Sequence, residues 1–279
     1  MGFLGLGQMG SLLARRLVDW PGGLVVHDIR PEAAAALVDA GATPAASVAD
    51  VAAAADLVCV MVLDDGQVRD VVAAALAAAR PGLIVAVHST IRVATAEAMA
   101  ATCSEHGVFL LDAPVSGGAM GAAQGRLAVM VGGDRQAYER SRPAFSRFAD
   151  LVTHFGPPGA GTRAKLARNL VNFVGMAASL EAQRLAEAAG VDLAKLARVT
   201  THSDAVTGGP GAIMVRDTTA PLAPGDPLGP IFSHTRDLGR KDLGLALELA
   251  EELDIELPLA RVAAARLDDY LGLNPKEER

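Results

Sequence analysis

Short apolar runs alternate with alanine-rich stretches along the first half of the chain. The alanine-rich stretches have the composition of helices, whereas the apolar runs would bury both faces of a strand. Parallel strands buried on both faces need a helix to return the chain between them. The pattern therefore predicts a doubly wound α/β domain with a parallel sheet, whose strands lie at residues 2–6, 24–27, 57–62, 83–88, 109–111 and 128–131.

The pattern changes after the glycine- and proline-rich stretch at residues 156–161. Residues 162–189 hold helix-forming residues and no proline, which predicts one long helix. The remaining chain is helical in composition, apart from a segment rich in glycine and proline at residues 207–230. We therefore expect a doubly wound domain at residues 1–160 and an all-α domain at residues 161–279, joined by the long helix.

Composition excludes several classes of protein. The chain has 279 residues, 51% of them hydrophobic, and a net charge of −7, which disfavours nucleic acid and anionic membrane surfaces as partners. Its mean hydropathy is +0.30, but its apolar runs are short, and none approaches the roughly 18 residues of a membrane span. The N-terminus does not resemble a secretory signal. A cytoplasmic protein is expected.

Cysteine and histidine give no sign of a metal or disulfide site. The two cysteines, Cys59 and Cys103, are too few for a disulfide framework, and the six histidines lack the spacing of metal ligands. His88 follows a predicted strand. Two interpretations are open for it: it contacts a functional site, or it is a strand-end histidine that hydrogen-bonds its neighbours.

A glycine-rich motif follows directly on the first predicted strand. In residues Gly5-Leu6-Gly7-Gln8-Met9-Gly10, the first glycine permits a tight turn, the second lets the backbone approach a pyrophosphate, and the third allows close packing of the following helix. Asp28 ends the second strand, where a carboxylate can bind the ribose of NAD. The motif predicts a dinucleotide site in a Rossmann-type domain. The alternative is a glycine turn followed by a solvated acid.

A second glycine pair follows the fifth predicted strand. The segment 112–118 ends in Ser116-Gly117-Gly118 and lies where a doubly wound sheet binds its ligands. A serine hydroxyl beside two glycine N–H groups can bind a small carboxylate. An ordinary turn rich in proline and glycine is the alternative interpretation.

Two polar residues share one face of the predicted long helix. Lys165 and Asn169 are four residues apart, so both can contact one ligand. A lysine can exchange a proton with a hydroxyl or carbonyl oxygen if burial or a nearby positive charge lowers its pKa. Spacing alone would equally fit a solvated lysine beside a capping asparagine. Lys241, just before a predicted helix at residues 243–253, would on its own be a solvated helix start.

Together these motifs resemble the β-hydroxyacid dehydrogenase family, to which 3-hydroxyisobutyrate dehydrogenase belongs. The resemblance covers nearly the whole chain and rests on four motifs in order, at residues 2–10, 109–133, 159–169 and 241–243. It implies that Lys165 is the general acid/base, that Asn169 orients the substrate, and that Ser116, Gly117 and Gly118 bind it. It also implies a cofactor site made of Gly5, Leu6, Gly7, Gln8, Met9, Gly10, Asp28, Thr90 and Lys241.

The resemblance implies a reversible oxidation of a small 3-hydroxy acid with NAD or NADP. Asp28 followed by Ile29 resembles the NAD-preferring members, although Arg30 argues for NADP. Tartronate semialdehyde reductase and threonate dehydrogenase are alternatives. An imine reductase or a non-catalytic dinucleotide-binding protein would usually lack Lys165. Relatives that pair through their helical domains imply a homodimer or homotetramer, in which Lys241 could serve its own site or its partner's.

The chain also departs from the family pattern at two places near the cofactor. Residues 61–68 lack a frequent Met-Leu-Pro sequence, and residues 91–93 lack the proline that usually follows the Ser89-Thr90 pair.

Overall fold

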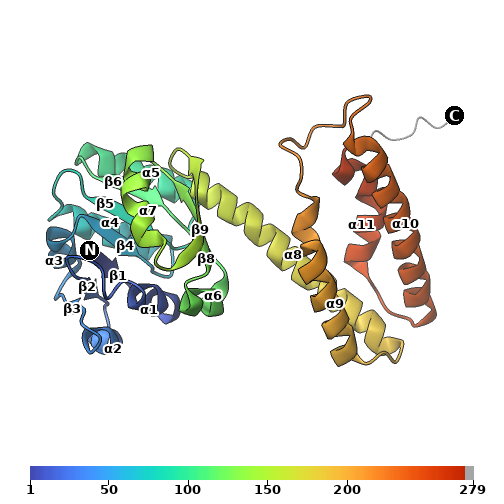
Figure 1. Cartoon of the computed structure of the whole chain (residues 1–279), viewed down its shortest axis with the longest axis horizontal. Helices are drawn as coiled ribbons and strands as arrows, with labels where there is room; N and C mark the ends of the chain where they lie inside the picture. Colours follow the sequence, from blue (N-terminus) through green and yellow to red (C-terminus); the bar gives the residue numbers. More distant parts are fainter. Residues whose placement is uncertain (274–279) are drawn as a thin grey trace. The chain divides into compact units, whose positions relative to one another are not determined.

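The computed structural model describes residues 1–273 and divides into two compact units (Figure 1). The first unit is Met1–Arg168, and the second begins at Asn169. The division falls inside the helix α8, Ala160–Ala188, which the sequence predicted at residues 162–189. The predicted domain boundary at residues 160 and 161 coincides with the first turn of this helix.

The first unit is built on one sheet with the strand order β3-β2-β1-β4-β5-β6-β8-β7, in which β9 also pairs with β8. This order and the helical second unit confirm the predicted fold class. All six predicted strands are present. The strands are β1 Gly2–Leu4, β2 Val25–His27, β3 Thr43–Pro44, β4 Leu57–Val60, β5 Ile84–Val87, β6 Phe109–Asp112, β7 Val115–Ser116, β8 Leu127–Gly132 and β9 Ala149–Gly156.

The sheet departs from the predicted parallel arrangement at β8 and β9, which run opposite to its other strands. β8 runs antiparallel to both β6 and β7, while all the other pairs are parallel. The connection between β7 and β8, residues 117–126, is shorter than the dozen or so residues that a parallel crossover needs. The chain therefore returns in the opposite direction.

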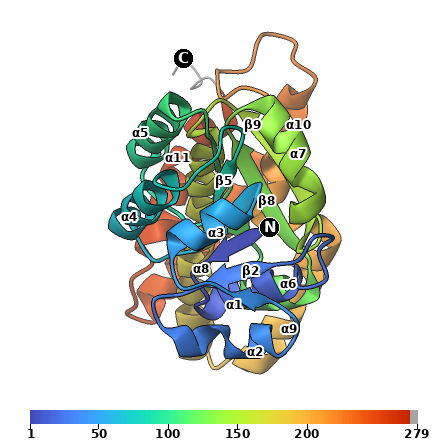
Figure 2. The same ribbon diagram turned by 90° about the vertical axis from the view of Figure 1, so that its left-hand side faces the viewer.

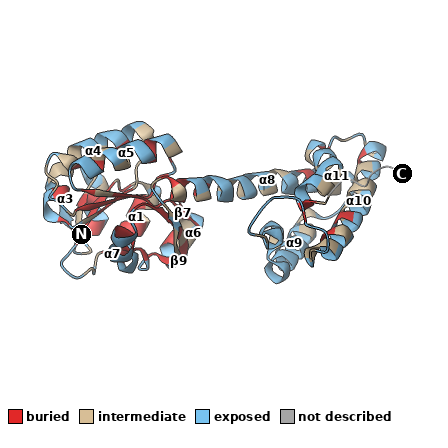
Figure 3. Ribbon diagram, turned by 90° about the horizontal axis from the view of Figure 1, so that it is seen from above, coloured by how far each residue is buried: buried red, intermediate tan, exposed pale blue. Residues whose placement is uncertain are grey.

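Helices cover both faces of the sheet. Figures 2 and 3 show α4 and α5 on one face and α7 on the other, with buried strands between them. Successive residues of a strand point to opposite faces, so Phe3 and Leu4 enter two different core clusters. The helices of this unit are α1 Gln8–Arg15, η1 Pro31–Ala34, α2 Ala35–Val38, α3 Val48–Ala54, α4 Asp65–Leu76, α5 Val93–Glu105, α6 Gly118–Gln124 and α7 Arg135–Phe145.

The second unit is helical throughout its described residues. After α8 it contains α9 Leu193–Thr207, η2 Gly209–Ile213, α10 Leu228–Glu252 and α11 Pro258–Leu271. The glycine- and proline-rich segment separates α9 from α10, as predicted. Within residues 1–273, no helix combines the length and the apolar composition that a membrane span needs.

Candidate active site

The glycine motif forms the turn between β1 and α1, and each of its glycines has a distinct surrounding. Gly5 has a φ of +86°, and a Cβ there would lie 2.3 Å from the Met61 carbonyl oxygen. A Cβ on Gly10 would lie 2.0 Å from the Gly5 carbonyl oxygen. At Gly7, no atom of residues 1–273 outside its immediate chain neighbours lies within 4 Å of a Cβ position, so the backbone there is open to a ligand. This is the arrangement that a pyrophosphate requires.

Asp28 follows β2 and is fixed by the backbone around it. Its Oδ2 accepts a hydrogen bond from the Leu6 N–H at 2.7 Å, and its Oδ1 accepts one from the Arg30 N–H at 2.9 Å. The Arg30 Nε lies 3.6 Å from Oδ1. Burial alone would raise the pKa of Asp28, but these hydrogen bonds and the charge of Arg30 hold the pKa below its ordinary value. The carboxylate is therefore ionised at neutral pH.

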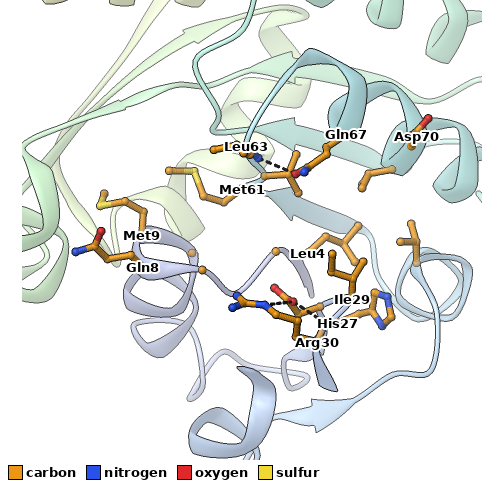
Figure 4. Close-up of a pocket in the computed structure, with 17 residues that line it drawn as sticks. Leu4, Gln8, Met9, His27, Ile29, Arg30, Met61, Leu63, Gln67 and Asp70 are labelled. Carbon is orange, nitrogen blue, oxygen red and sulfur yellow. Dashed lines mark hydrogen bonds and ion pairs between the residues drawn. The ribbon is translucent and has the colours of Figure 1, made fainter. Parts of the chain in front are cut away.

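A cavity of about 700 Å³ opens beside the glycine motif and Asp28. Figure 4 shows Met61 and Leu63 across this cavity from Ile29 and Arg30, with Gln8 and Met9 at the start of α1. A volume of this size fits a cofactor-sized ligand. Its lining residues are Leu4, Gly5, Gly7, Gln8, Met9, Gly10, His27, Asp28, Ile29, Arg30, Val48, Met61, Val62, Leu63, Gln67, Asp70 and Val71.

Ser89 and Thr90 follow β5 and differ in their surroundings. The buried Ser89 Oγ donates a hydrogen bond to the Val62 carbonyl oxygen at 2.7 Å, and it accepts one from the Val62 N–H at 2.9 Å. Ser89 thereby fixes the segment after β4 that lines the cavity. Thr90 is exposed, so its hydroxyl is available to a ligand.

The predicted substrate segment lies between β6 and α6. Ser116 is buried at the end of β7, and Gly117 and Gly118 have φ values of +129° and +64°. Within the described part of the chain, a Cβ on Gly118 would meet nothing within 4 Å, so the backbone of Gly118 faces open space. These features leave room for a small ligand beside the serine.

Lys165 lies in the second turn of α8, in the part of the helix that belongs to the first unit. The residue is 8% exposed. Burial, followed by the positive charge of Arg168, lowers the pKa of its ammonium group. A lowered pKa is the property that the sequence analysis required of a proton-exchanging lysine. Asn169, one turn further along α8, is the first residue of the second unit.

The structure corrects the predicted position of Lys241 and adds Asp112 to the site. Lys241 does not stand before a helix, because α10 begins at Leu228 and places Lys241 in its second half, where its Nζ lies 3.0 Å from the Asp242 Oδ1. Asp112 was not identified as a site residue from sequence. Its carboxylate accepts hydrogen bonds from the N–H groups of Gly159 and Thr162, at the start of α8. The partners are too distant in sequence for a local pattern to indicate them.

Comparisons with known proteins match both units. Residues 1–156 match the model of the NAD binding domain of 6-phosphogluconate dehydrogenase, and residues 159–271 match the model of the NAD-binding region of NADP-dependent 3-hydroxyisobutyrate dehydrogenase. An uncharacterized oxidoreductase of Mycobacterium tuberculosis is 55% identical over 98% of this chain and 93% of its own length.

Two further relatives carry named activities. An NAD-dependent L-serine dehydrogenase of Pseudomonas aeruginosa is 36% identical over 94% of this chain and 88% of its own length. The structure of a Mycobacterium tuberculosis 3-hydroxyisobutyrate dehydrogenase with L-serine has a TM-score of 0.67 at 34% identity, and it covers 96% of this chain and 92% of its own.

Proposed function

The chain belongs to the β-hydroxyacid dehydrogenase family, that of 3-hydroxyisobutyrate dehydrogenase, and is an NAD(P)-dependent hydroxyacid dehydrogenase. From this premise we propose that it oxidises a small 3-hydroxy acid reversibly, with Lys165 as the general acid/base. 3-Hydroxyisobutyrate is the first candidate substrate. L-serine, L-threonate and the reverse reaction with tartronate semialdehyde are alternatives within the same chemistry, and relatives named for L-serine and L-threonate favour testing those two together with it.

The burial of Lys165 is the observation that carries this proposal. Its pKa is lowered, so a larger fraction of the amine is neutral and able to accept a proton than for an exposed lysine. In the oxidation, the neutral Nζ takes the proton from the 3-hydroxyl group as the carbonyl forms. In the reduction, the ammonium returns that proton to the oxygen. Bound NAD supplies the hydride acceptor.

We assign substrate binding to Ser116, Gly117, Gly118 and Asn169. The serine hydroxyl and the glycine N–H groups donate hydrogen bonds to the carboxylate, and the Asn169 amide orients the hydroxyl-bearing carbon. A fixed orientation of this kind is worth several orders of magnitude in rate. A small acid has few groups of its own, so these contacts would be needed to hold it in one pose.

We also propose that the cofactor is NAD rather than NADP. Asp28 is ionised and would repel a 2′-phosphate, while its remaining lone pairs can accept a hydrogen bond from a ribose hydroxyl. The guanidinium of Arg30 lies beside this carboxylate, which offsets part of its positive charge. Thr90 and Lys241 complete the assigned cofactor residues. NADP remains the alternative to be measured alongside.

The test is a spectrophotometric screen with NAD and NADP, using 3-hydroxyisobutyrate, L-serine, L-threonate, glycerate, 4-hydroxybutyrate and 6-phosphogluconate. We expect turnover with NAD and a 3-hydroxy acid, and a loss in kcat of about 10²- to 10⁴-fold in Lys165→Ala. The matched control is Lys195→Ala, because Lys195 is an exposed lysine of α9. Equal kcat in wild type and Lys165→Ala would refute the assignment. Cofactor binding without turnover on any acid would favour the imine reductase or the non-catalytic alternative.

The chain is further proposed to form a homodimer, or a homotetramer built from such dimers. The observation that supports this is the long helix α8, on which Leu170, Phe173, Met176 and Leu180 are each more than half exposed. A helix with a wide apolar surface is normally covered by another surface. A second copy of the chain is the partner that the family resemblance implies. The cytoplasmic location stays a prediction from sequence.

A further inference from the structure

The carboxylate of Asp112 lies at the junction of the sheet and α8. Asp112 ends β6 and is 1% exposed. Its Oδ1 accepts a hydrogen bond from the Gly159 N–H at 2.8 Å, and its Oδ2 accepts one from the Thr162 N–H at 2.6 Å. The first N–H groups of a helix have no partner inside the helix. Asp112 thus caps α8 from a strand 47 residues earlier in the chain.

The first turn of α8 also lies directly against the backbone of the sheet. A Cβ on Gly161 would lie 2.3 Å from the Met130 carbonyl oxygen and 2.4 Å from the Asp112 carbonyl oxygen. A Cβ on Gly132 would lie 2.4 Å from the Asp112 Oδ1. Only glycine at both positions allows this approach. The carboxylate therefore holds a helix whose distance from the sheet is already set by backbone contact.

Lys165 follows Thr162 by three residues, which is about one helical turn. A shift or rotation of the first turn of α8 would consequently move the Lys165 side chain. A displacement of about 1 Å at a reacting group can cost about 100-fold in rate. The same segment that Asp112 begins, residues 112–118, also contains Ser116, Gly117 and Gly118. One carboxylate therefore connects the proposed substrate segment with the helix of the proposed acid/base.

We propose that Asp112 is a positioning residue that fixes Lys165 by holding the first turn of α8 against the ends of β6 and β8. The expected effect of Asp112 on the reaction rate rests on the proposed function of Lys165. The expected effect of Asp112 on the position of the Lys165 side chain does not. Asp112 exerts its effect through the helix.

Asp134 offers a matched control for a purely structural cap. It lies in the same unit, and its Oδ1 accepts a hydrogen bond from the Ala137 N–H at 2.8 Å at the start of α7. α7 carries none of the assigned site residues. Loss of this cap should lower stability without affecting Lys165 or the reaction.

The first experiment measures the surroundings of Lys165 without using activity. The full-length protein is labelled with a limiting amount of acetic anhydride, and peptide mass spectrometry gives the labelling of Lys165 relative to the exposed Lys195. We expect this ratio to rise in Asp112→Ala, to rise less in Asp112→Asn, which keeps one acceptor oxygen, and to stay at the wild-type value in Asp134→Ala. If Asp112→Ala does not fold, Asp112→Asn decides. A ratio unchanged in the Asp112 variants would overturn the proposal.

The second experiment measures kcat and the KM for NAD in the same variants. We expect Asp112→Ala to lower kcat by about 10- to 100-fold while the KM for NAD stays unchanged. In a Lys165→Ala background, the further loss on removing Asp112 should disappear, because both changes affect the same group. A full additional loss in that background would overturn the proposal. One further outcome is a raised labelling ratio in Asp112→Ala together with a wild-type kcat in both Asp112→Ala and Lys165→Ala. This outcome would support the positioning of Lys165 by Asp112 and refute the catalytic role of Lys165.

Discussion

His88 shows how the surroundings of one residue settle what its sequence left open. The sequence allowed it either to contact the site or to hydrogen-bond its neighbours, and the structure encloses it in the aromatic core of the first unit. The rings of Phe145 and Phe148 lie edge-on to it, with centroids at 5.2 and 5.5 Å. Its Nδ1 is 2.8 Å from the Ala113 carbonyl oxygen, while its buried Nε2 has no hydrogen-bond partner among residues 1–273. Burial lowers the pKa of His88 to about 4.

This burial predicts a loss of stability in mild acid. The unfolded chain protonates His88 near pH 6.5, whereas the folded chain does so only near pH 4, so the unfolded state binds more protons between these values. The free energy of unfolding is unaffected by protonation of His88 above pH 6.5. It falls as the pH decreases from 6.5 to 4, and the total decrease is about 3 kcal/mol. Urea unfolding at pH 7 and pH 4.5 should show a smaller pH-dependent loss in His88→Leu than in wild type.

The exposed His106 provides the control for that measurement. His106→Leu should keep the wild-type pH dependence, because this variant removes an exposed histidine and leaves the buried His88 in place. An equal loss between pH 7 and pH 4.5 in His88→Leu and wild type would contradict the assignment of the acid sensitivity to His88.

The elements that sequence predicted correctly are those whose pattern is local. β4 and β5 are continuous apolar runs because both of their faces are buried. β9 was not predicted because it is a partly exposed strand whose polar and apolar residues follow neither a continuous apolar run nor a regular alternation. The start of α10 was also missed. Its first half contains Arg236 and Asp237, and the buried Arg236 pairs with Asp268 of α11, a partner that no local pattern shows.

The same distinction separates the site residues. The glycine motif at residues 5–10 belongs to two elements that are adjacent in sequence, so a local pattern can indicate its turn, and a cavity lies beside it. Asp112 binds N–H groups 47 and 50 residues away. These hydrogen bonds form only when the fold brings β6 and α8 together, so the periodicity of the sequence does not predict them.

Glu181 makes a prediction at the scale of helices. Its buried carboxylate, on α8, accepts hydrogen bonds from the N–H groups of Leu259 and Ala260 at 2.8 and 3.1 Å. These groups lie in the first turn of α11, which has no side-chain cap of its own. Glu181→Ala should lower the free energy of unfolding of the second unit by about 1 to 3 kcal/mol, since two N–H groups lose their partner.

Hydrogen exchange followed by mass spectrometry should detect this loss as faster exchange in α11. Glu187→Ala is the control, because Glu187 is exposed on the same helix. The capping role is wrong if α11 exchanges equally fast in Glu181→Ala and in the control.

At the scale of the whole molecule, the two ends of α8 have different roles. Its first turns, in the first unit, are held by Asp112 and carry Lys165. Its later turns, in the second unit, contribute Glu181 to α11 and expose a wide apolar surface. The exposed apolar residues of α8 extend from Leu166 to Leu180, and none of them lines the cavity beside the glycine motif.

If a second copy of the chain covers this surface, light scattering should give a particle mass of at least twice the chain mass of 28.6 kDa. Leu170→Glu with Phe173→Glu places two charges on the exposed apolar residues, and a buried unpaired charge is costly enough to prevent association. We therefore expect this variant to have the mass of a single chain. Ala182→Glu adds a charge at an exposed position on the opposite side of the helix from Phe173 and should leave the assembly intact. A wild-type protein of single-chain mass at micromolar concentration would rule out self-association through α8.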